Sequence, residues 1–152
     1  MAPPVSALLD SPLRPPTSVR NGAFVRSLYK AFSRLARTGE IAEYVSENFD
    51  PECEYWPVEE ASPIHGHKAL IRWIERWLEA WDDTWEKTEE ILEHGEMVVV
   101  STWVHGRGRI SGMEISQRLF DVFELRDGKV LRITEYLDPR EALKASGLLQ
   151  AA

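Results

Sequence analysis

Apolar residues recur at intervals of three and four over residues 24–36, which is the spacing of one face of an α-helix. They are Phe24, Leu28, Tyr29, Phe32, Leu35 and Ala36. Thr38-Gly39 ends this predicted helix, because glycine readily adopts the left-handed conformation of a helix C-cap. A second, shorter helix is expected over residues 41–48, and residues 52–56 alternate as a short strand.

The clearest helical pattern covers residues 62–81, which read SPIHGHKALIRWIERWLEAW. Its apolar face is formed by Leu70, Trp73, Ile74, Trp77, Leu78 and Trp81. Charged residues occupy the opposite face, so the segment is amphipathic. Large apolar side chains at helical spacing are usually buried, and the aromatic stripe therefore predicts a helix that packs on the core.

From residue 84 onwards the alternation is typical of β-strands. We expect strands over residues 84–93, 97–109, 114–125 and 129–137. The first of them carries Glu86, Glu89, Glu90 and Glu93, which predicts a solvated face. Asp127-Gly128 joins the last two strands as a hairpin, because both central residues of the favoured turn need a positive φ.

A final helix is expected over residues 139–146. Asp138 suits the N-cap, Pro139 the first helical position and Glu141 a capping box, and Gly147 follows the last helical residue. Helices that are segregated from antiparallel strands predict an α+β fold, with the helices packed on one face of a curved sheet.

The length of 152 residues predicts one folded domain over residues 21–152. Residues 1–20 hold five prolines and few large apolar groups, so we expect a disordered Pro-rich tail outside the fold. The formal net charge of −7 argues against nucleic acid and anionic membranes as partners. No apolar run approaches the ~20 residues of a membrane span, and the N-terminus lacks the pattern of a secretory signal.

Neither a metal nor a cofactor is expected from the sequence. His65 and His67 form an H-x-H pair, but zinc needs three or four ligands and no partner cluster of His, Cys or Asp is evident nearby. A lone Cys53 allows no internal disulfide, which fits a cytoplasmic protein. Cys53 itself is expected to be a small buried apolar residue.

Asp121 is the main candidate for chemistry. It shares one face of its predicted strand with Leu119, Phe123 and Leu125, where the pattern favours apolar residues. A buried carboxyl must be paired or kept neutral by a raised pKa, and such groups cluster at functional sites. The alternative is a structural carboxylate that is satisfied by a hydroxyl or a backbone group.

Further candidates surround Asp121 in the predicted arrangement. His105 ends a strand face that includes Trp103, where it could move protons near neutral pH or simply lie in solvent. Tyr29 lies on the apolar face of the first helix and supplies a hydroxyl. The residues predicted to bind a ligand are Phe32, Trp56, Trp73, Trp103, Phe123 and Tyr136.

Three stretches, in this order and at this spacing, resemble the nuclear-transport-factor-2-like superfamily. They are Thr38-Gly39-Glu40 between two helices, Pro63-Ile64-His65-Gly66 before the Trp-rich helix, and Phe120-Asp121-Val122-Phe123 leading to Asp127-Gly128-Lys129-Val130. The chain looks nearest to the SnoaL-like and ketosteroid-isomerase-like members. The resemblance implies a cone-shaped sheet wrapped around helices, an apolar pocket, and a homodimer through the outer sheet face.

The resemblance also implies roles for single residues. Asp121 matches an acid that transfers a proton in SnoaL-like cyclases. In ketosteroid isomerases the matching acid is held protonated and donates a hydrogen bond to the developing oxyanion. Phe32 stands where the isomerases have a tyrosine, although Tyr29 lies one turn earlier on the same face. Trp56 and Pro57 stand where the isomerase base is expected, and neither can take a proton.

Two functions from different classes follow from these residues. The first is a cofactor-free enzyme of the isomerase, cyclase or hydrolase type on a hydrophobic organic substrate, with Asp121 transferring a proton and His105 or Tyr29 assisting. The second is a non-catalytic module that binds a small apolar ligand or serves as a dimeric scaffold. The same superfamily fold hosts enzymes and binding proteins, so the fold alone does not decide between them.

Overall fold

The computed structural model describes residues 2–9 and 20–150. Its helices are the 3-10 turn η1 (Val5–Leu8), α1 (Arg20–Phe32), α2 (Leu35–Thr38), α3 (Ile41–Asn48), α4 (Gly66–Ala80) and α5 (Pro139–Ser146). Its strands are β1 (Phe49–Trp56), β2 (Ile64–His65), β3 (Trp81–His94), β4 (Met97–Gly108), β5 (Glu114–Arg126) and β6 (Lys129–Tyr136).

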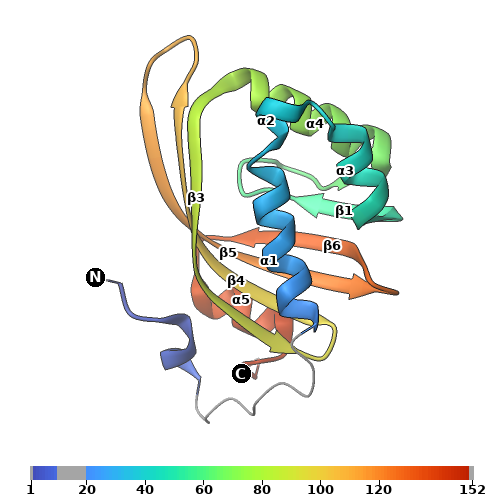
Figure 1. Cartoon of the computed structure of the whole chain (residues 1–152). Coiled ribbons are helices and arrows are strands. Elements are labelled where there is room, and N and C mark those ends of the chain that lie inside the picture. The colour runs from blue at the N-terminus through green and yellow to red at the C-terminus, as the bar shows by residue number, and fades with distance from the viewer. Residues whose placement is uncertain (1, 10–19, 151–152) are drawn as a thin grey trace.

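The strands form one curved six-stranded sheet in the order β2-β1-β6-β5-β4-β3. All neighbouring pairs are antiparallel except β1 and β6, which run parallel. Helices α1, α3 and α4 lie against one face of the sheet, which we call the inner face, and α5 lies against the outer face (Figure 1). The predicted α+β fold, with a bent sheet wrapped around helices, is confirmed.

Local signals in the sequence fix most element boundaries. Gly39 follows α2 with φ 69°, and Gly147 follows α5 with φ 82°, so both are the left-handed caps that were predicted. Asp127 (φ 51°) and Gly128 (φ 77°) form the turn between β5 and β6. The Asp138 side chain accepts a hydrogen bond from the Arg140 N–H at 2.9 Å and caps α5.

Two apolar clusters fill the two sides of the sheet. The inner cluster joins α1, α3 and α4 to the sheet and includes the fully buried Val25, Val45 and Val130. The outer cluster joins α5 to β4 and β5 through Leu143 and Val99. Because both faces of the central strands are covered, these strands are apolar on both sides, as in Val98-Val99-Val100.

The N-terminal segment departs from the predicted tail. Val5 is only 2% exposed and belongs to the outer cluster, beside α5. Its backbone N–H donates to Glu90 at 2.7 Å, and the Pro3 carbonyl accepts from Arg118 at 3.1 Å. Residues 3–9 therefore belong to the fold, because their apolar side chains cover a sheet face that α5 leaves open. Residues 10–19 lie outside the described residues.

Helix α4 ends one residue earlier than its apolar stripe predicts. Ala80 is its last residue, and Trp81 begins β3 in extended conformation. Among residues 2–9 and 20–150, no helix is long and apolar enough to cross a membrane.

Candidate functional site

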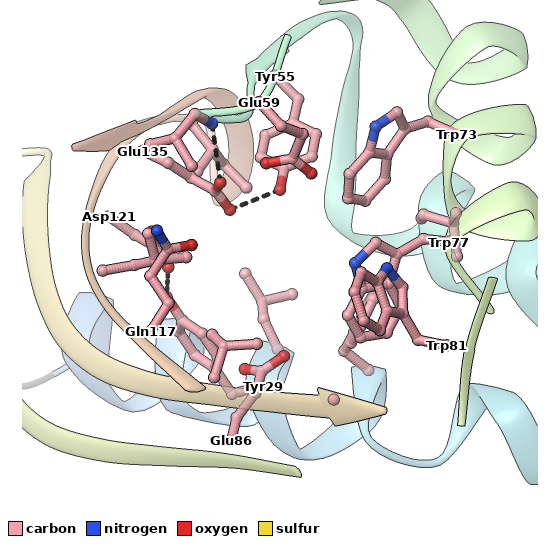
Figure 2. Close-up of a pocket in the computed structure, with 18 of the residues that line it drawn as sticks. Tyr29, Tyr55, Glu59, Trp73, Trp77, Trp81, Glu86, Gln117, Asp121 and Glu135 are labelled. Carbon is pink, nitrogen blue, oxygen red and sulfur yellow. Dashed lines mark hydrogen bonds between the residues drawn. The ribbon is translucent and has the colours of Figure 1, made fainter. Parts of the chain in front are cut away.

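A cavity of about 520 Å³ lies between the inner face of the sheet and helices α1, α3 and α4. This volume lies in the range of pockets for small organic ligands. Its aromatic lining consists of Tyr29, Phe32, Tyr44, Phe49, Tyr55, Trp73, Trp77, Trp81 and Phe123. Figure 2 shows carboxyl groups on one side of this cavity and indole rings on the other.

Asp121 lies on β5 and is only 6% exposed. Its Oδ2 accepts a hydrogen bond of 2.5 Å from the Tyr29 hydroxyl of α1. Its Oδ1 is buried and has no hydrogen-bond partner among the described residues. Burial raises the pKa of Asp121 to about 7, opposed by the Tyr29 hydrogen bond and assisted by the negative charge of Glu86.

Glu135 lies directly opposite Asp121 on the neighbouring strand β6. Its Oε2 accepts a 2.6 Å hydrogen bond from the Tyr55 hydroxyl, and its Oε1 accepts from the Val58 N–H at 3.2 Å. Burial and then the charge of Asp121 raise the pKa of Glu135 to about 8, although its two hydrogen bonds act in the opposite direction. The site therefore contains two facing carboxyls, each held by a tyrosine.

Glu86 supplies a third carboxyl, from β3. Its Oε2 is buried and has no hydrogen-bond partner among the described residues. Burial, and less strongly the charge of Glu135, raises the pKa of Glu86 to about 7. The prediction of a solvated face at Glu86 was wrong. The rest of that acidic run, Glu89, Glu90 and Glu93, accepts hydrogen bonds from Arg118, Val5 and Gly22 respectively.

The two tyrosines serve as hydrogen-bond donors. Burial, followed by the negative charges nearby, raises the pKa of both Tyr29 and Tyr55 well above the usual value. Both phenols therefore stay protonated at neutral pH, and each donates to one carboxyl. Tyr29 is also held edge-on against Phe123, with 5.8 Å between ring centroids.

His105 belongs to the cavity lining, but its ring is engaged elsewhere. It stacks on Trp85 with 5.0 Å between centroids and 11° between planes. Its Nε2 lies 3.9 Å from a Glu114 carboxylate oxygen. The structure thus brings together six of the nine predicted site residues, namely Asp121, His105, Tyr29, Phe32, Trp73 and Phe123.

The other three predicted residues lie outside the cavity. Trp56 is 41% exposed, and its indole N–H donates to the Glu60 carbonyl at 3.0 Å, because Tyr55 takes the inward position on β1. On β4, Thr102 pairs with the cavity residue Leu119, so the strand alternation places the next residue, Trp103, on the outer face. Tyr136 also lies on the outer face, where it packs against the outer cluster.

A β-bulge explains why Glu135 was missed and Tyr136 was chosen. Leu125 pairs with Val130, whereas Glu124 pairs with Arg132, so one extra residue interrupts β6. An unbroken alternation that starts from the buried Val130 would place Tyr136 on the inner face. The bulge changes the phase, so that Ile133 and Glu135 line the cavity instead. A bulge of this kind leaves no clear sequence signal.

The two histidines of the H-x-H pair contact other groups. His67 Nε2 lies 2.8 Å from the Phe49 carbonyl, and His65 lies 3.9 Å from Glu54. Within the described part of the chain, no three His, Cys, Asp or Glu side chains are grouped to hold a metal ion. Cys53 is buried and unpaired, as expected of a small apolar residue.

Comparisons with known proteins agree with this architecture. The sequence model of the SnoaL-like domain family matches residues 25–133. A search among curated proteins gives no match. Among solved structures, a provisionally assigned SnoaL-like polyketide cyclase from Jannaschia sp. CCS1 is 19% identical, with a TM-score of 0.71 over 90% of this chain and 97% of that one.

Two further solved structures with this fold contain small organic molecules. TerC, co-crystallised with polyporic acid, is 19% identical, with a TM-score of 0.64 over 84% of this chain and 97% of that one. A protein with a ketosteroid isomerase-like fold from Catenulispora acidiphila DSM 44928, in complex with trimethylamine, is 14% identical. Its TM-score is 0.62, over 80% of this chain and 93% of that one. At these identities the likeness establishes the fold.

Proposed function

We propose that this chain, which belongs to the SnoaL-like domain family, binds a hydrophobic organic molecule in the cavity and transfers a proton on it through Asp121. One observation carries the proposal. Asp121 lines an aromatic cavity, and its Oδ2 is fixed by Tyr29, while its buried Oδ1 has no hydrogen-bond partner among the described residues. One oxygen is therefore held in place, and the hydrogen-bonding capacity of the other is unused.

The protonation equilibria of the site suit acid–base chemistry at neutral pH. General acid–base catalysis is most efficient when the pKa of the group lies near the working pH, and that of Asp121 is raised to about 7. Two facing carboxyls also disfavour ionisation of both at once. With Glu135 protonated, its pKa raised to about 8, Asp121 can ionise and act as the base.

The proposed chemistry begins with the transfer of one proton. Asp121 Oδ1 removes a proton from a carbon next to a carbonyl, and the electron pair delocalises onto the carbonyl oxygen as an enolate. Where the enolate is conjugated with a C=C bond, return of the proton from Asp121 to the far carbon of that bond isomerises the substrate. Where the enolate carbon instead attacks a second carbonyl in the same molecule, a C–C bond closes the ring and the resulting alkoxide takes the proton back from Asp121. Tyr29 positions Asp121, and the aromatic wall holds the apolar part of the substrate.

Two solved structures with the same fold support a small organic ligand, since one was co-crystallised with polyporic acid and the other is in complex with trimethylamine. The two molecules differ in chemistry. They support a small-molecule pocket and leave the substrate to be found by experiment.

Hydrogen–deuterium exchange on a simple carbon acid tests the proposal without knowledge of the substrate. 2-Tetralone is apolar, fits the size of the cavity and carries acidic C–H groups beside its carbonyl. We expect the protein to accelerate exchange of these protons in D2O near neutral pD. Asp121→Asn should reduce the enzymatic rate by about 100-fold or more. Exposed Glu47 is the control position, and Glu47→Gln should retain the rate. Equal exchange in Asp121→Asn and the unmodified chain would contradict the role of Asp121.

A non-catalytic ligand-binding or scaffold role is the second candidate. The observation in its favour is that Trp56, which stands where the related isomerases have a base, faces away from the cavity. If 2-tetralone binds, as measured by isothermal titration calorimetry, but the folded protein does not accelerate its exchange, the binding role is the better description.

The family resemblance also supports a homodimer through the outer sheet face. Val5 and Leu143 already cover part of this face, so a second copy would pack on the part that η1 and α5 leave open. Sedimentation equilibrium at micromolar concentration measures the mass directly, and a monomer there would contradict this part of the proposal.

A further inference from the structure

We infer that the cavity recognises an organic cation, a ligand with a protonated or quaternary amine flanked by apolar groups. The inference deepens the proposed function and rests on it only in placing the ligand in this cavity. It follows from three features of the lining, namely its charges, its unpartnered oxygens and the indoles that face them.

The cavity contains acidic groups without cationic partners. Glu86, Asp121 and Glu135 line it, and none of the 25 lining residues is a lysine or arginine. The three carboxyls are close enough that the negative charge of each one raises the pKa of one of the other two. A ligand with a positive charge would supply the countercharge that the protein lacks.

Two carboxyl oxygens of the residues that line the cavity lack a hydrogen-bond donor. Asp121 Oδ1 and Glu86 Oε2 are both buried and have no hydrogen-bond partner among the described residues. A buried acceptor without a donor is costly, and native structures rarely retain one without a reason. The Tyr29 and Tyr55 hydroxyls donate to Asp121 Oδ2 and Glu135 Oε2, so they do not relieve these two atoms.

The wall across the cavity carries three indole rings, which can make cation–π contacts. Figure 2 shows Trp73, Trp77 and Trp81 on the side facing Asp121 and Glu135. The indoles of Trp73 and Trp77 are stacked, 6.5 Å apart with 21° between planes, and Tyr55 meets Trp73 edge-on at 4.9 Å. Indole is the aromatic ring that attracts a cation most strongly. A cation between these walls would have indole rings on one side and carboxyl groups on the other.

Other ligand charges fit less well. An anion would face the carboxyls of Glu86, Asp121 and Glu135, with Glu59 also in the lining and no lysine or arginine, so it would bind only with further proton uptake. A neutral ligand leaves the charge of any ionised carboxyl uncompensated. An organic cation can contact the carboxyls and the indoles at the same time, and it binds best when the carboxyls are ionised.

A pair of isosteric probes separates charge from shape. Benzyldimethyl(2-hydroxyethyl)ammonium carries a permanent positive charge, and 3,3-dimethyl-4-phenylbutan-1-ol has carbon in place of nitrogen. Because the ammonium probe does not titrate, any change of its affinity with pH originates in the protein. The titratable groups that face the cavity are Tyr29, Tyr44, Tyr55, Glu59, Glu86, His105, Asp121 and Glu135.

Isothermal titration calorimetry should show the ammonium probe binding about tenfold tighter than the alcohol at pH 8.5. At pH 5.5 this ratio should fall, because protonation neutralises the carboxyls and leaves only the indoles to favour the cation. Glu86→Gln should lower the ratio at pH 8.5 by about fivefold, whereas the exposed Glu47→Gln should leave it unchanged. Circular dichroism verifies that both variants are folded.

The ratio of the two affinities decides the inference. Binding of the alcohol as tight as that of the ammonium probe at pH 8.5, or no measurable binding of the ammonium probe, would overturn it. A preference for the cation that survives Glu86→Gln would remove Glu86 from the recognition of charge. Exchange on 2-tetralone tests the proposed function separately, so either result can fail while the other stands.

Discussion

Glu86→Gln gives the sharpest test of how the cavity affects stability. The Glu86 carboxyl is buried among apolar groups and faces a like charge, and its pKa is raised from its ordinary value of 4.5 to about 7. The folded chain therefore holds a proton that the unfolded chain releases at lower pH. Stability from this group is fully present below pH 4.5 and is lost as the pH rises through about 7. Glutamine has nearly the same shape and does not titrate.

The size of the effect follows from the pKa. Raising it from 4.5 to about 7 costs the folded state about 3 kcal/mol once Glu86 is ionised. Most of that change falls between pH 5 and pH 8.5, where it amounts to about 2.5 kcal/mol. We therefore expect Glu86→Gln to gain about 2.5 kcal/mol relative to the unmodified chain over this interval. For a chain of this size the gain corresponds to roughly 5–10 °C in melting midpoint.

Urea unfolding at closely spaced pH values measures this difference directly. The free energies of the two proteins should lie closest at pH 5 and separate as the pH rises, with the variant the more stable at pH 8.5. Exposed Glu47→Gln removes one negative charge without touching the cavity and should follow the unmodified chain. If the curves of Glu86→Gln and the unmodified chain stay parallel from pH 5 to pH 8.5, Glu86 does not ionise in the cavity as argued.

Three substitutions test the packing that supports the site, each by urea unfolding. Val5→Ala should cost about 1–2 kcal/mol because Val5 is buried against the outer sheet face, and no loss would show that residues 3–9 do not pack there. Leu143→Ala should cost about 2–5 kcal/mol, since the fully buried Leu143 anchors α5, and a loss below 1 kcal/mol would contradict that anchoring. Asp138→Ala should cost about 1 kcal/mol through the lost helix cap, whereas Asp138→Asn should retain most of it.

The fold was largely predictable because the ends of its helices and strands depend on interactions between residues close together in the sequence. Gly39 and Gly147 end helices in the left-handed conformation, and Asp127-Gly128 forms the turn with positive φ at both residues. These features act within a few residues of sequence and need no information about distant contacts. The segment that escaped prediction, residues 3–9, is held by contacts with residues more than 80 positions away.

The candidate site was only partly predictable because it depends on strand phase. The alternation of β5 is regular around Asp121, which allowed this residue to be placed on the inner face. The bulge in β6 reversed the phase before Glu135, and register shifts in β3 hid the inward position of Glu86. Trp103 and Tyr136 were misplaced because α5 and η1 make the outer face apolar too, so hydrophobicity did not distinguish the two faces.

The cost of the buried carboxyls and the choice of ligand are linked. Near neutral pH each ionised carboxyl in the cavity lowers the stability of the protein, because burial disfavours the charged form and no lysine or arginine lines the cavity. A cation that binds between Asp121, Glu86 and the indoles removes part of that cost, so its binding is coupled to the loss of protons from the site. A neutral carbonyl compound supplies no countercharge, so it should favour proton uptake by Glu86 and Glu135, while Asp121 can still ionise and act as the base. The proton count on binding, measured by calorimetry in buffers of different ionisation enthalpy, therefore has opposite signs for the two classes of ligand. It distinguishes recognition of a cation from recognition of a neutral substrate by the same residues.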